Sequence, residues 1–78
     1  MKVQAFGIVK DIFSNSILDV APKNASTVDE LKMFLEEKYP RLKELASYMV
    51  AVNDEYASTN IVINENDEIA IIPPVSGG

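Results

Sequence analysis

The run TVDELKMFLEEKY, residues 27–39, has the pattern of an amphipathic helix that begins at a capped threonine. Thr27 and Glu30 have capping-box spacing, in which the hydroxyl accepts from the third helical N–H and the glutamate reaches back. Apolar side chains recur at helical spacing and form one stripe: Val28, Leu31, Phe34 and Leu35. Pro40 ends the helix near Tyr39. We therefore expect one principal helix lying against a sheet.

Short β-strand patterns flank this helix on both sides. The predicted strands are residues 2–7, 17–21, 48–52, a short segment around Tyr56, and residues 68–73. Short helical turns are expected at residues 8–13 and 41–47, and Asn53-Asp54 predicts a hairpin turn. Two strands, a helix and then further strands indicate an α+β roll, with a mixed sheet of about five strands.

Residues 69–72 are consecutively apolar, which is unusual for a strand with one face in water. This strand is therefore central in the sheet, or its second face meets a partner, and both can hold. Phe6, Tyr56 and Ile72 are the candidates for an exposed apolar patch that binds this partner. The alternative is that loops or short helices cover these three side chains.

Composition excludes several kinds of chemistry. The chain has 78 residues, no cysteine and no histidine, and a formal net charge of −5. Disulfides, persulfides and Ser-His or Cys-His nucleophile pairs are therefore impossible. The negative charge argues against nucleic-acid binding, and a domain this small rarely encloses a substrate pocket beside its core. We expect a carrier or binding subunit rather than an enzyme acting alone.

Membrane and metal binding are not expected either. No apolar run has membrane-spanning length and the N-terminus does not resemble a signal peptide, so a cytoplasmic location is expected. The carboxylates Glu65, Asp67 and Glu68 do not have EF-hand spacing and are interpreted as a solvated turn. Met33 and Met49 are expected to fill the core.

The sequence ends Pro73-Pro74-Val75-Ser76-Gly77-Gly78, and each part of this segment has a physical meaning. Proline cannot continue a strand ladder, so Pro73-Pro74 favours a stiff, extended exit from the domain. Gly77-Gly78 has no side chains and can thread a narrow channel. We therefore divide the chain into a domain, residues 1–72, and an extended tail, residues 73–78.

The whole chain resembles the molybdopterin synthase small-subunit (MoaD) family of ubiquitin-like sulfur carriers. The resemblance rests on Ala51-Val52-Asn53, on the turn Asn66-Asp67-Glu68, and above all on the ending of residues 73–78. It implies a β-grasp (ubiquitin-like) fold and a role as the sulfur donor of molybdopterin synthase. The implied acceptor is cyclic pyranopterin monophosphate, which becomes the molybdopterin dithiolene.

The resemblance also implies a mechanism and partners. A MoeB-like enzyme related to ubiquitin E1, using ATP and magnesium, would adenylate Gly78, and a sulfur donor protein would convert it to a thiocarboxylate. The tail would then enter a MoaE-like large subunit. Gly77 would let the tail pass, and the remaining tail residues Pro73, Pro74, Val75 and Ser76 would bind the partner. This chain would bind no cofactor of its own.

Three alternatives remain open at this point. A ThiS-type carrier for thiamin biosynthesis has a similar ending, although the doubled proline and the greater length favour the molybdopterin member. A ubiquitin-like protein modifier would be activated in the same way but would join Gly78 to target lysines. A plain binding module would have an inert tail.

Overall fold

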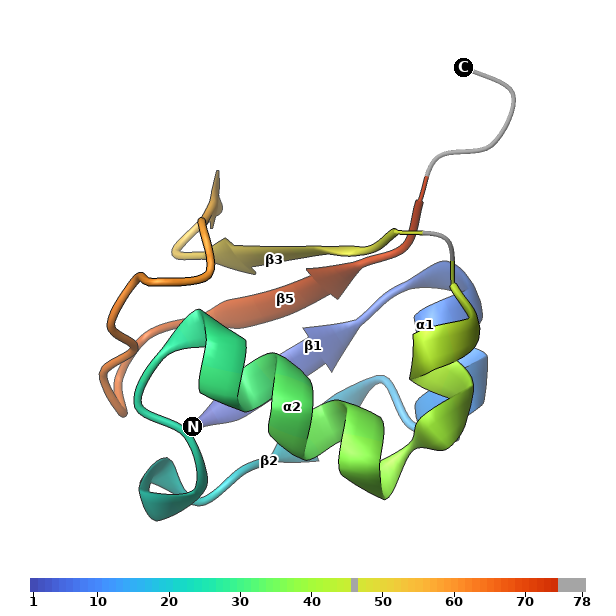
Figure 1. The fold of residues 1–78 in the computed structure, drawn as a ribbon, viewed down its shortest axis with the longest axis horizontal. Helices are drawn as coiled ribbons and strands as arrows, with labels where there is room; N and C mark the ends of the chain where they lie inside the picture. The colour runs from blue at the N-terminus through green and yellow to red at the C-terminus, as the bar shows by residue number, and fades with distance from the viewer. Residues whose placement is uncertain (46, 75–78) are drawn as a thin grey trace.

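The computed structural model describes residues 1–45 and 47–74 as one sheet with helices packed on it (Figure 1). The strands are β1 (Lys2–Ala5), β2 (Ile17–Asp19), β3 (Met49–Val52), β4 (Glu55–Tyr56) and β5 (Ile69–Ile72). The α-helices are α1 (Gly7–Phe13) and α2 (Val28–Lys38), and the 3₁₀ helices are η1 (Pro22–Asn24) and η2 (Pro40–Glu44). The expected mixed α+β architecture is confirmed.

The five strands lie in the order β2-β1-β5-β3-β4. β1 and β5 pair in parallel, with Val3 opposite Ile69, whereas the other pairs are antiparallel. β5 is therefore a central strand, as its consecutively apolar residues indicated. Val3, Ile69 and Ile71 point from this centre into the core and are almost fully buried.

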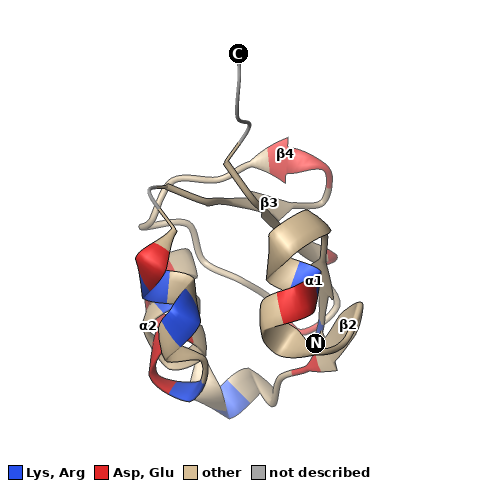
Figure 2. Cartoon of the chain, turned by 90° about the vertical axis from the view of Figure 1, so that its right-hand side faces the viewer, with Lys and Arg blue, Asp and Glu red and all other residues tan. Residues whose placement is uncertain are grey.

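The core lies between the sheet and α2, which crosses one face of the sheet (Figure 1). Val28, Leu31 and Leu35 are the buried positions of the α2 stripe, while Phe34 is half-buried at its edge. Each fully buried leucine or isoleucine stabilises the fold by roughly 1.5–3 kcal/mol. The opposite side of α2 carries charges of both signs (Figure 2), as expected for a solvated helix face.

The start of α2 is held by both its own cap and a distant loop. The Thr27 hydroxyl accepts from the N–H of Glu30 at 3.2 Å, as predicted, but the Glu30 carboxylate bonds Ser26, one residue before the cap. The N–H groups of Val28 and Asp29 also have no acceptor within the helix. They donate to two carbonyls in the loop after β4. These bonds fix the loop of residues 57–63 against the helix.

Several predicted boundaries were wrong. The first strand ends at Ala5 because Gly7, with φ of +55°, begins α1, and the strand predicted for residues 17–21 spans only Ile17–Asp19. The helix predicted for residues 41–47 is the 3₁₀ helix η2, which begins at the proline that stops α2. The described residues contain no helix that is long and apolar enough to cross a membrane.

Two further expectations concern methionines and the division of the chain. Met33 is 63% exposed and Met49 is 47% exposed, so the expectation that they fill the core was wrong. Met33 lies outside the apolar stripe of α2, and Met49 points to the face of the sheet opposite Val50. The division at residues 72 and 73 stays a prediction; β5 does end at Ile72.

The Asn53-Asp54 hairpin turn is confirmed, with φ of +52° and +68° at its two residues. The Asn53 side chain donates to the Asp67 carboxylate at 3.0 Å and accepts from the N–H of Glu68 at 2.9 Å. The N–H of Asn64 also donates to Asp67. One asparagine therefore joins the β3–β4 hairpin to the turn that precedes β5.

Candidate functional site

The candidate site is the face of the sheet that α2 does not cover. Side chains alternate between the faces of a strand, so residues opposite in register share a face. The register places one row of side chains across this face: Ile17, Gln4, Ala70, Ala51 and Tyr56. Tyr56 is 66% exposed and Ile17 is 47% exposed, which leaves apolar surface at both ends of the row.

A second apolar row lies where β5 ends. Met49 is opposite Ile72, and Phe6 follows Ala5, which is opposite Ile71. The extended backbone of Phe6 therefore places its side chain beside Ile72. Phe6 is 45% exposed, Ile72 is half-buried between its neighbours, and the tail begins at the next residue.

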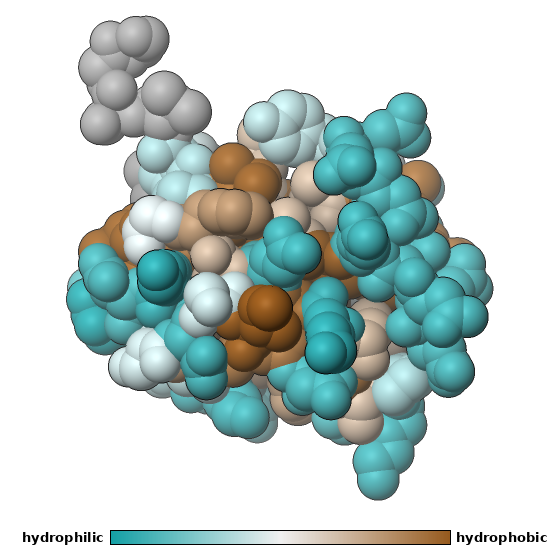
Figure 3. Space-filling view, turned by 180° about the vertical axis from the view of Figure 1, so that it is seen from behind, coloured by the Kyte–Doolittle hydropathy of each residue, from teal (hydrophilic) through white to brown (hydrophobic). Residues whose placement is uncertain are grey.

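We give the name outer apolar face to the apolar residues of these two rows that are not buried: Phe6, Ile17, Met49, Tyr56, Ala70 and Ile72. Figure 3 shows hydrophobic surface on this side of the molecule, interrupted and bordered by hydrophilic side chains. An apolar surface with a polar border is typical of a protein–protein interface. The outer apolar face can therefore dock a partner at the base of the tail.

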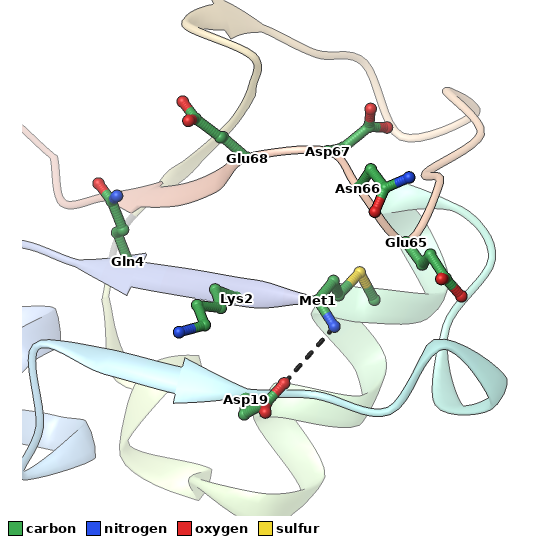
Figure 4. A pocket seen from close by; sticks show the side chains of 8 residues that line it. All are labelled: Met1, Lys2, Gln4, Asp19, Glu65, Asn66, Asp67 and Glu68. Atoms are coloured by element: carbon green, nitrogen blue, oxygen red, sulfur yellow. Dashed lines mark ion pairs between the residues drawn. The ribbon is translucent and has the colours of Figure 1, made fainter.

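The other end of the sheet is polar. A hollow of about 410 Å³ lies there, lined by Met1, Lys2, Gln4, Asp19, Glu65, Asn66, Asp67 and Glu68 (Figure 4). The Met1 ammonium group donates to the Val20 carbonyl at 2.8 Å and lies 3.5 Å from the Asp19 carboxylate. Within residues 1–45 and 47–74, no three acidic or metal-ligating side chains are arranged to hold a metal ion. This polar end therefore contrasts with the apolar end from which the tail leaves.

Hydrogen bonds in the loops hold two carboxylates in their ionised form. The N–H of Asn64 and the Asn53 amide lower the pKa of Asp67. The N–H and hydroxyl of Ser26 likewise lower the pKa of Glu30. Both groups stabilise local structure, and neither lies on the outer apolar face.

Three of the residues predicted for the site lie on the same face of the sheet, and four others lie outside the described residues. Phe6 and Tyr56 are exposed and Ile72 is half-buried on one face, while Pro73 and Pro74 are half-buried after β5. The other predicted residues, Val75, Ser76, Gly77 and Gly78, lie outside the described residues. Their roles in sulfur transfer and in partner binding stay predictions.

Sequence reasoning missed Ile17 and Met49. The signal for Met49 was available, because it has the opposite parity to the apolar Val50 and therefore faces away from the core. Ile17 gave no such signal. Its place beside Gln4 depends on how β2 pairs with β1, which the sequence pattern alone does not specify.

This chain is similar in sequence to known proteins over almost its whole length. Residues 3–78 match the model of the ThiS family. The molybdopterin synthase sulfur carrier subunit of Dictyostelium discoideum is 44% identical over 81 residues, a match that covers 99% of this chain and 94% of that protein.

This chain is also similar in fold to solved structures. Small archaeal modifier protein 1 from Methanosarcina acetivorans superposes with a TM-score of 0.82 at 24% identity, covering 99% of this chain and 94% of that one, and confirms the β-grasp fold. A complex of subunits 1 and 2 of the molybdopterin-converting factor from Helicobacter pylori contains a chain with a TM-score of 0.69 and 28% identity. That match covers 99% of this chain and 96% of the other.

Proposed function

The chain belongs to the ThiS family, and from this premise we propose that it carries sulfur on Gly78 as the small subunit of a molybdopterin synthase. It is a sulfur carrier subunit of the molybdopterin type rather than of the thiamin type, since three relatives matched over 82–96% of their length are molybdopterin synthase sulfur carrier subunits. The reaction that it serves is sulfur donation to cyclic pyranopterin monophosphate, which forms the dithiolene.

One structural observation supports this proposal most directly. The outer apolar face and the start of the tail meet at the end of β5, where Ile72 lies between Phe6 and Met49 and Pro73 follows. A partner that docks on this face necessarily has the tail beside it. Docking and delivery of the terminal group are thereby combined in one interface.

The proposed chemistry takes place at the carboxylate of Gly78. A carboxylate is a poor electrophile, so ATP first converts it to an acyl-adenylate with release of pyrophosphate. Hydrosulfide, delivered at the oxidation level of sulfide, then attacks the acyl carbon, the carbon–oxygen bond to AMP breaks, AMP leaves, and a thiocarboxylate remains. The chain has no histidine, the side chain most often used for proton transfer, and we assign the acid–base chemistry to the partner proteins. Glycine leaves the acyl carbon sterically open.

The partners follow from this chemistry. A large subunit is supported by the two-subunit complex to which this chain is similar. We further propose a MoeB-like adenylating enzyme, which uses ATP and magnesium, and a sulfur donor protein. Because activation consumes ATP, we expect the chain to work in the cytoplasm.

Intact-protein mass spectrometry tests the proposal. The chain is incubated with ATP, magnesium, a sulfur source and the adenylating enzyme of the same organism, and the C-terminal peptide is then fragmented. Replacement of one oxygen by sulfur at Gly78 is the expected result. No change with an active partner enzyme would refute the sulfur-carrier role, and isopeptide adducts to lysine would indicate a protein modifier instead.

A further inference from the structure

Gly7 and Pro73 pack directly against each other, although they are far apart in the sequence. Gly7 is the first residue of α1 and has φ of +55°, a conformation that disfavours L side chains. A Cβ built on Gly7 would lie 3.2 Å from Cγ of Pro73. Carbon atoms pack best at about 3.5–4.0 Å, so a Cβ at Gly7 would push the proline ring away by a few tenths of an ångström.

The topology explains why these two residues meet. β1 and β5 are adjacent and parallel, so both strands leave the sheet at the same edge. After β1, the chain turns at Gly7 into α1, and after β5 it continues into Pro73. The start of α1 is therefore the surface against which the first residue of the tail lies.

The restricted backbone of Pro73 allows this contact to affect the direction of the chain. The ring fixes its own φ near −65°, and Pro74 disfavours the helical conformation at Pro73. Because both φ and ψ of Pro73 are restricted, the position of its ring against Gly7 sets the direction in which the backbone leaves Pro73. A side chain at Gly7 would displace the ring and turn that direction.

We propose that Gly7 is a positioning residue for the start of the tail: its bare backbone seats Pro73 and so sets the direction in which the chain leaves the domain. The effect on sulfur transfer rests on the proposed sulfur-carrier function. A misplacement of about 1 Å can lower the rate of a transfer reaction about 100-fold, so a small change of direction is measurable.

The test is a double-mutant cycle of Gly7→Ala and Pro73→Ala in the full chain. The readout is ATP-dependent thiocarboxylation by the adenylating enzyme, measured as kcat and KM at a temperature where all variants are folded. For Gly7→Ala we expect kcat to fall on the order of 10- to 100-fold. KM should change little, because the outer apolar face is intact. Pro73→Ala removes Cγ, so the double variant should react at the rate of Pro73→Ala alone.

Ser14→Val is the matched control for backbone strain. Ser14 caps the other end of α1 with φ of +57°, so a β-branched residue there strains the same helix at the end opposite to Gly7. We expect this variant to lose stability while its kcat stays unchanged. Equal kcat in Gly7→Ala and the wild type would overturn the proposal, as would additive losses in the double variant.

A second readout does not use the activating enzyme. Carbon chemical shifts of Pro73 and Pro74, measured by NMR, should change in Gly7→Ala and stay unchanged in Ser14→Val. Unchanged shifts in Gly7→Ala would refute the positioning role even if the wild type carries sulfur. Conversely, changed shifts in a chain that accepts no sulfur would refute the sulfur-carrier function and leave the contact established.

Discussion

Asn53 stabilises the fold in two ways, through its backbone conformation and through its side chain. Its φ of +52° suits asparagine better than most residues, and its side chain bonds both Asp67 and the N–H of Glu68. We expect Asn53→Ala to lower the free energy of unfolding by about 2–3 kcal/mol, since it loses both contributions. Asn53→Gly keeps the conformation and should cost about 1–2 kcal/mol less. Chemical denaturation of both variants measures the difference, and equal losses would contradict the assigned role of φ.

Asp67 makes stability depend on pH. Its donors bind the ionised form and lower its pKa in the folded state below the ordinary value of 3.8. The stabilisation is therefore complete above that value and is lost as pH falls through the lower, folded pKa. We expect Asp67→Asn to unfold at a lower denaturant concentration than the wild type near neutral pH. This gap between the two unfolding midpoints should close in acid. Glu65→Gln, from the same loop, controls for net charge; a gap that does not depend on pH would contradict the linkage.

At the scale of elements, α2 and the outer apolar face differ in how far the sequence predicted them. The start of α2 was predictable because a capping hydroxyl, an apolar stripe and a stopping proline are all local signals. A helical turn was predicted at residues 41–47, but neither its 3₁₀ form nor the turn into α1 at Gly7 follows from the hydrophobic periodicity of the sequence. Phe6 and Tyr56 were among the predicted residues, but the row that joins Tyr56 to Ile17 depends on strand order.

The two exposed methionines offer a matched test of the outer apolar face. Met49 lies on that face and Met33 on the solvated side of α2. We expect Met49→Ala to weaken binding to the large subunit by about 1–2 kcal/mol, roughly a tenfold change, and Met33→Ala to leave it unchanged. Isothermal titration calorimetry measures both affinities, and thermal unfolding checks that both variants fold. Equal affinities would exclude this face from the interface.

At the scale of the whole molecule, the proposed function requires that Gly78 be the terminal residue. We expect that one lysine added after Gly78 abolishes the gain of sulfur without changing the unfolding temperature, because the acyl carbon is then locked in an amide. Removal of that lysine with carboxypeptidase B should restore the gain. Mass spectrometry follows both steps, and sulfur on the extended chain would refute a thiocarboxylate at Gly78.

The parallel pairing of β1 with β5 also has a consequence for biosynthesis. β5 leaves the ribosome after the other four strands, yet it lies between β1 and β3 in the finished sheet. A nascent chain therefore holds two unpaired halves of the sheet until β5 emerges, and a product that stops short of β5 stays open to proteases. The strand that closes the sheet is the one that continues into the tail, so the sheet is complete only in a chain whose synthesis has reached Ile72, the residue before Pro73.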